Sequence, residues 1–104
     1  MTKLEKEIER ALVEAVEALG GQCIKWTSPG TTGLPDRIVL LPGARIAFVE
    51  LKRPKGSRKG SLQPYWRRVL TRLGFLHWWV YCEADIEALL EHMGGMDYAG
   101  KPVC

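Results

Sequence analysis

Residues 35–52 read PDRIVLLPGARIAFVELK and contain two strand-like runs, 36–41 and 45–52, separated by Pro42-Gly43-Ala44. A Pro- and Gly-containing segment between two such runs is typical of a tight turn, so the stretch is predicted to form a β-hairpin. Both faces of the second run are largely apolar. This pattern predicts a central strand that is covered on both sides.

The predicted hairpin brings charged residues together. Pairing about Gly43 joins residues whose numbers sum to about 86, which sets Asp36 across from Glu50 with Cβ atoms roughly 5 Å apart. Glu50 and Lys52 project from one face of their strand, while Leu51 points into the core. Two carboxylates this close repel each other unless a cation lies between them. The sequence therefore predicts that Asp36 and Glu50 hold a hard divalent cation, Mg²⁺ or Mn²⁺. The alternative is a surface cluster of salt bridges at a strand end.

The apolar pattern outside the hairpin predicts five further elements and one loop. Helical spacing and turn residues define the helices, and short apolar runs define the strands. The order of elements is helix, three strands, helix, strand, helix. The segments are helix 4–19, strand 22–26, loop 27–35, helix 62–73 with Ser61 as N-cap, strand 75–82 and helix 84–93.

The chain as a whole has the composition of one globular domain. It has 104 residues, of which 46% are hydrophobic and 26% charged, so we expect one domain, with a core at about 4–93 and a loose tail at 94–104. A net charge of +3 mildly favours a nucleic-acid partner. No signal peptide and no run of membrane-spanning length is recognisable, so a soluble cytoplasmic protein with no membrane partner is expected.

The pair Pro35-Asp36 followed by Glu50-Leu51-Lys52 resembles the PD-(D/E)XK nuclease signature. The longer series from Glu5 through residues 33–37 and 48–52 to Gln63 resembles more specifically the VRR-NUC family, the virus-type replication-repair nucleases. This resemblance covers roughly residues 4–90. It implies an α/β fold with a restriction-endonuclease-like αβββαβ core, in which helices flank a central mixed sheet.

The resemblance also implies an activity: Mg²⁺- or Mn²⁺-dependent hydrolysis of phosphodiester bonds in DNA, by endo- or exonuclease action. Relatives often act on branched DNA such as flaps or Holliday junctions, in DNA repair. By analogy we expect a homodimer and a helicase or other replication-repair partner. Stand-alone domains of this size are typical of phage genomes.

The resemblance further implies roles for particular residues. The backbone carbonyl of Leu51 would be a metal ligand, and Lys52 would orient or activate the attacking water or neutralise charge on the phosphorus. A glutamate on the first helix would join them. Glu5 borders the apolar stripe, about 60° from its centre at 100° per residue, so we prefer it. Glu7 is the alternative, and both Glu7 and Glu9 are expected to point further towards solvent.

Two other groups of residues lie beside the predicted site. Gln63, in the first turn of its helix, is expected to position a water or phosphate, although it could be an ordinary helix residue. A basic loop follows Lys52 and is expected to contact phosphates; its candidates are Arg53, Lys55, Arg58 and Lys59. The alternatives to a self-sufficient nuclease are a non-catalytic DNA-binding or assembly subunit of the same fold and a nuclease that depends on a partner.

Overall fold

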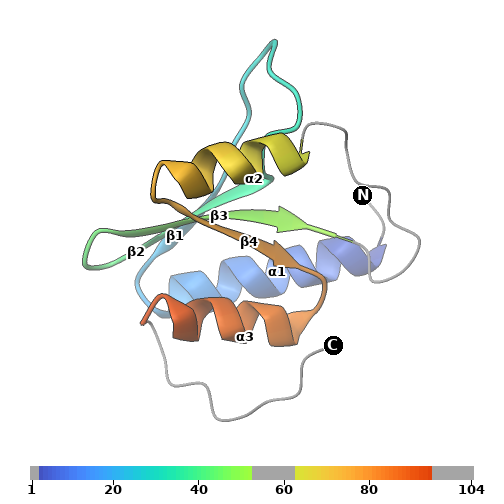
Figure 1. Ribbon diagram of the computed structural model, residues 1–104. Coiled ribbons are helices and arrows are strands. Elements are labelled where there is room, and N and C mark those ends of the chain that lie inside the picture. Colours follow the sequence, from blue (N-terminus) through green and yellow to red (C-terminus); the bar gives the residue numbers. More distant parts are fainter. Residues whose placement is uncertain (1–2, 53–62, 95–104) are drawn as a thin grey trace.

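The computed structural model describes residues 3–52 and 63–94. The elements follow the predicted order, and their ends differ from the predicted ones by no more than two residues (Figure 1). No helix in these two ranges is both long and apolar enough to cross a membrane. The elements are α1 (Lys3–Ala18), β1 (Gln22–Lys25), β2 (Arg37–Leu41), β3 (Arg45–Leu51), α2 (Gln63–Arg72), β4 (Leu76–Val80) and α3 (Glu83–His92).

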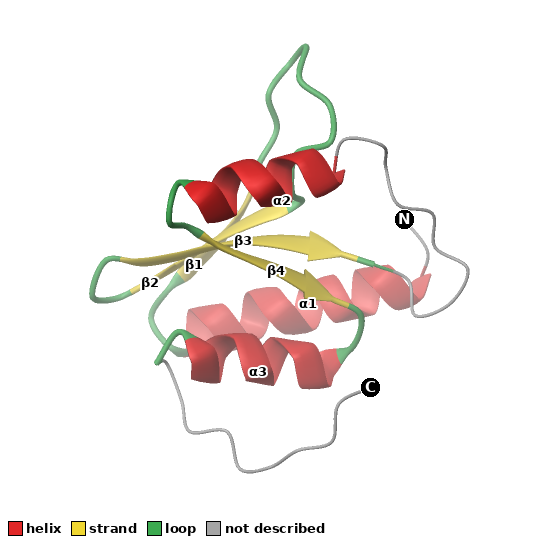
Figure 2. Ribbon diagram, viewed as in Figure 1, coloured by secondary structure: helices red, strands yellow, loops and turns green. Residues whose placement is uncertain are grey.

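The four strands form one mixed sheet in the order β1-β2-β3-β4. Strand β2 is antiparallel to both of its neighbours, β1 and β3, whereas β3 and β4 are parallel. Helices α1 and α3 cover one face of the sheet and α2 covers the other (Figure 2). The prediction of an α/β fold with a mixed sheet between helices is confirmed, and so is the central position of β3.

The main hydrophobic core lies between the sheet and the pair α1 and α3. Leu12 and Val16, one helical turn apart on α1, are fully buried there, as are Val39 of β2 and Val49 of β3. Because side chains alternate along a strand, the even-numbered residues of β3 face α2 instead. Phe48 belongs to this second face, where it packs against aromatic side chains.

Those aromatic side chains form a smaller cluster under α2. The Trp26 ring lies 5.0 Å from that of Phe48 and 6.3 Å from that of Trp66, between ring centroids. Phe75 meets Phe48 edge to face at 5.5 Å. Aromatic pairs at these separations contribute attraction beyond the area that they bury. The cluster thus holds α2 against β3 next to Glu50.

The hairpin between β2 and β3 has the register that the sequence predicts. Its paired residues include Arg37 with Val49 and Leu41 with Arg45, and all the pairs sum to 86. Gly43 and Ala44 have φ values of 88° and 61°, so the chain reverses through two left-handed residues. Glycine adopts that conformation freely, whereas alanine is strained there.

Candidate active site

Asp36 lies directly before β2, at the end of the sheet opposite the hairpin turn. Continuing the register one pair beyond Arg37 and Val49 places Asp36 across from Glu50, as predicted. Two backbone features hold it there. Pro35 before it is fully buried, and the carbonyl of Asp36 accepts a hydrogen bond of 3.2 Å from the amide of Trp26.

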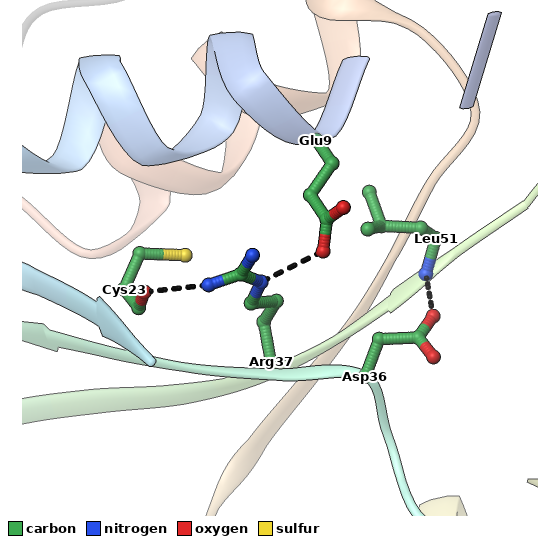
Figure 3. A network of polar contacts seen from close by, with 5 residues as sticks. All are labelled: Glu9, Cys23, Asp36, Arg37 and Leu51. Atoms are coloured by element: carbon green, nitrogen blue, oxygen red, sulfur yellow. Dashed lines mark hydrogen bonds and ion pairs between the residues drawn. The ribbon is translucent and has the colours of Figure 1, made fainter. Parts of the chain in front are cut away.

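The Asp36 carboxylate joins the two strands. Its Oδ2 accepts a hydrogen bond of 2.8 Å from the backbone amide of Leu51 (Figure 3). The side chains of Asp36 and Glu50 are also hydrogen-bonded to each other. One carboxyl group of such a pair must carry a proton when no cation separates them. The carboxyl groups of Asp36 and Glu50 therefore lie close enough together to bind the same cation.

Burial changes the acidity of both carboxyl groups. Glu50 is only 3% exposed, and its burial, together with the charge of Asp36, raises its pKa from 4.5 to about 8. Burial also raises the pKa of Asp36, against the opposing effect of its hydrogen bond from Leu51. A perturbed pair of this kind is typical of functional sites. It would hold a shared proton at neutral pH that a metal cation could displace.

Lys52 is held beside this pair by two contacts. Its Nζ lies 3.8 Å from Oε2 of Glu50 and 5.7 Å from the centroid of the Trp79 ring. Trp79 is the residue of β4 that pairs with Glu50, and the guanidinium of Arg67 from α2 lies 5.8 Å from the same ring. Lys52 is 4% exposed. An ammonium so buried is stabilised by a carboxylate and by the face of an aromatic ring.

Helix α1 brings Glu5 to the site. Glu5 is half-buried, and its charge makes the smallest of the contributions that shift the pKa of Glu50. Glu7, the alternative, is exposed. Of the two residues considered from the sequence, the structure brings Glu5 towards the carboxylate pair.

The expectation that Glu9 points towards solvent was wrong. Glu9 and Arg37 form an ion pair of 2.8 Å, and both side chains are 14% exposed (Figure 3). Arg37 also donates a 2.9 Å hydrogen bond to the carbonyl of Cys23, so it links α1, β1 and β2 beside Asp36. A signal was present in the sequence: alternation places Arg37 on the α1 face of the sheet, where a charged side chain needs a partner on the covering helix.

The remaining predicted site residues are placed only in part. Gln63 is the first residue of α2, which starts on the same side of the sheet as Glu50, and its side chain lies outside the described part of the chain. Leu51 ends β3 with its side chain in the core, and the role of its carbonyl stays a prediction. The basic-loop residues Arg53, Lys55, Arg58 and Lys59 lie outside the described residues.

The two carboxylates suit a hard divalent cation. Within residues 3–52 and 63–94, no three or more His, Cys, Asp or Glu side chains gather as a ready metal cage. Mg²⁺ does not need one, because proteins usually hold it through one or two carboxylates while it keeps waters and binds substrate phosphates. The hydrogen-bonded, proton-sharing pair of Asp36 and Glu50 matches that donor set.

The chain is similar to a protein described as a putative nuclease and to a solved structure of a VRR_NUC domain. No protein-family model matches the chain. The "Putative nuclease p44" of Acyrthosiphon pisum secondary endosymbiont phage 1 is 50% identical over 50 residues, which are 48% of this chain and 54% of that protein. The matched part thus spans about half the length of this relative. A solved structure described as a "VRR_NUC domain" is similar with a TM-score of 0.80 and 28% identity, covering 88% of this chain and 98% of that one.

Proposed function

Because the chain is a VRR-NUC domain, we propose that it is a metal-dependent nuclease that hydrolyses phosphodiester bonds in DNA. The observation that carries this proposal is the buried, hydrogen-bonded pair of Asp36 and Glu50 with Lys52 beside it. A cluster of surface salt bridges would leave these groups exposed, whereas Glu50 and Lys52 are almost fully buried. A phage relative described as a putative nuclease supports the same class.

Each residue of the site has a role in this proposal. Asp36 and Glu50 would hold Mg²⁺ or Mn²⁺, with the carbonyl of Leu51 as a further ligand. The bound cation supplies a polarised phosphoryl oxygen and a water of lowered pKa. Lys52, aligned by Glu50 and the Trp79 ring, would orient the attacking water or neutralise charge on the phosphate. Glu5 would help to hold the water shell of the cation, and Gln63 would contact the water or the phosphate.

The substrate and the assembly are part of the proposal too. We infer a preference for branched DNA, such as flaps or four-way junctions, and action as a homodimer, with a helicase or other repair protein as a partner. Contacts to the DNA backbone and to DNA shape, rather than to base edges, would carry this preference.

The proposal is tested by cleavage of labelled duplex, single-stranded, flap and four-way-junction DNA, with an RNA duplex alongside. Mg²⁺, Mn²⁺ and EDTA are compared for the wild type, Asp36→Asn and the control Glu14→Gln, an exposed acid of α1. We expect cutting that requires the metal, survives in Glu14→Gln and falls at least about 100-fold in Asp36→Asn. A folded wild type that cuts none of these substrates with either metal would favour a DNA-binding subunit or a partner-dependent enzyme instead.

A further inference from the structure

A basic groove runs between α1 and the edge strand β1, separate from the carboxylate pair. It encloses a cavity of about 440 Å³. Four of its six lining side chains are cationic and one is acidic. The lining residues are Lys6, Glu9, Arg10 and Val13 of α1, Lys25 of β1 and Arg37 of β2.

The charges of the groove are not balanced. Glu9 and Arg37 neutralise each other in their 2.8 Å ion pair. Lys6, Arg10 and Lys25 are exposed, and none of them forms an ion pair with a carboxylate of the described residues. Three positive charges are therefore available to a ligand.

Two of these cations lie side by side on one helix. Lys6 and Arg10 are four residues apart, so they are neighbours on the α1 surface. Like charges at this spacing destabilise a helix. Lys25, on the adjacent strand, adds a third positive charge to the same groove. An anionic ligand would remove this repulsion.

The groove is next to the candidate active site. Lys25 pairs with Arg37 at the end of β1 and β2, and Arg37 directly follows Asp36 in the chain. The charge of Glu9, which lines the groove, also acts on the Asp36 carboxyl group. A polyanion that reaches the carboxylate pair from this side passes the three free cations.

We propose that this groove binds the phosphate backbone of the DNA that flanks the cleaved bond, with Lys6, Arg10 and Lys25 as its contacts. The inference rests on the proposed nuclease function and adds a binding surface to it. Exposed Lys and Arg side chains contact phosphates without reading bases. Four of the six lining side chains are cationic, which favours a ligand with a continuous row of anionic phosphates over an acidic peptide. The contacts are independent of base sequence.

The test measures DNA affinity against salt concentration. Fluorescence anisotropy of a labelled duplex is recorded in EDTA and in the Asp36→Asn background, which are both expected to suppress cutting, for Lys6→Gln, Arg10→Gln, Lys25→Gln and the triple variant. The matched control is Arg72→Gln, an exposed helix arginine at the end of α2 away from Lys52. Each lost phosphate contact lowers the magnitude of the slope of log K against log salt by about 0.9.

We expect the slope to fall in magnitude by about 2 to 3 in the triple variant, with at least about tenfold weaker binding near 0.1 M salt. Arg72→Gln should leave both values unchanged. Circular dichroism verifies that each variant is folded; these side chains are exposed, so the single variants remain available if the triple variant is not. An unchanged slope, or an equal change from Arg10→Gln and Arg72→Gln, would overturn the groove assignment.

The outcomes separate this inference from the proposed function. Metal-dependent cutting by the wild type together with an unchanged slope would leave the nuclease standing and remove the groove. A reduced slope in a protein that cuts nothing would keep the groove as a DNA-binding surface and remove the nuclease.

Discussion

At the residue scale, the site is built by burying two carboxyl groups where only one of them can easily be charged. Asp36 and Glu50 share a hydrogen bond, and the pKa of Glu50 is raised to about 8 by burial and by the charge of Asp36. The sequence predicted this meeting because side chains alternate with a period of two along a strand and the turn sets the register. It did not predict the pairing of Glu9 with Arg37. Strand alternation places Arg37 on the α1 face of the sheet, but neither the strand period nor the helical period specifies which acidic side chain of α1 reaches it.

Glu5 and Glu7 provide a matched pair of residue-scale variants. Both are acids of the first turns of α1, but only the charge of Glu5 acts on Glu50. Loss of a side chain that supports metal ligands costs about 10- to 100-fold, so we expect Glu5→Gln to reduce the cleavage rate by that factor and Glu7→Gln to leave it within about twofold. Rates under single-turnover conditions with Mn²⁺ give the comparison. Equal effects of the two variants would remove Glu5 from the site.

At the scale of elements, the loop before Asp36 is tied to α2. The indole Nε1 of Trp66 donates a 3.1 Å hydrogen bond to the carbonyl of Thr32, and its ring contacts that of Trp26 at the start of the loop. The sequence predicted the loop and the helix, since Gly, Pro and polar residues mark one and helical spacing the other. Their contact joins residues 34 apart along the chain, and no local pattern contains that information.

Trp66→Phe removes this hydrogen bond and keeps an aromatic ring. We expect a loss of about 1 kcal/mol in the free energy of unfolding, which lowers Tm by about 4 to 8 °C in a domain of this size. Faster proteolysis within residues 27–35 should accompany it. The control Tyr65→Phe, at an exposed neighbouring position, is expected to stay within about 0.5 kcal/mol. Equal melting temperatures for the two variants would show that the tether does not stabilise the loop.

At the scale of the whole molecule, stability should depend on pH through the buried site. The unfolded chain has Glu50 ionised above pH 4.5, whereas the folded protein keeps it protonated up to about pH 8. The folded state therefore binds more protons in this range, and its stability falls as pH rises. His77 acts in the opposite sense, but only below its ordinary pKa of 6.5, because burial lowers its pKa to about 4.

Between about pH 7 and 8 Glu50 is the main contributor among the described residues with a shifted pKa, since the pKa of His77 lies lower and burial raises the pKa of the Cys23 thiol to about 11. We expect the metal-free wild type to lose about 1 kcal/mol of stability per pH unit there. Glu50→Gln should show almost no slope. Denaturant unfolding in EDTA at several pH values measures both, and parallel pH profiles for the two proteins would contradict a protonated Glu50.

The proposed nuclease activity depends on a metal site that Asp36 and Glu50 form together. Titration calorimetry with Mn²⁺ near pH 7, repeated in two buffers of different ionisation enthalpy, measures binding and proton release at once. We expect saturable binding to the wild type with release of about one proton, and loss of that binding in Asp36→Asn. No binding to the wild type at millimolar Mn²⁺, or equal binding to Asp36→Asn, would contradict it.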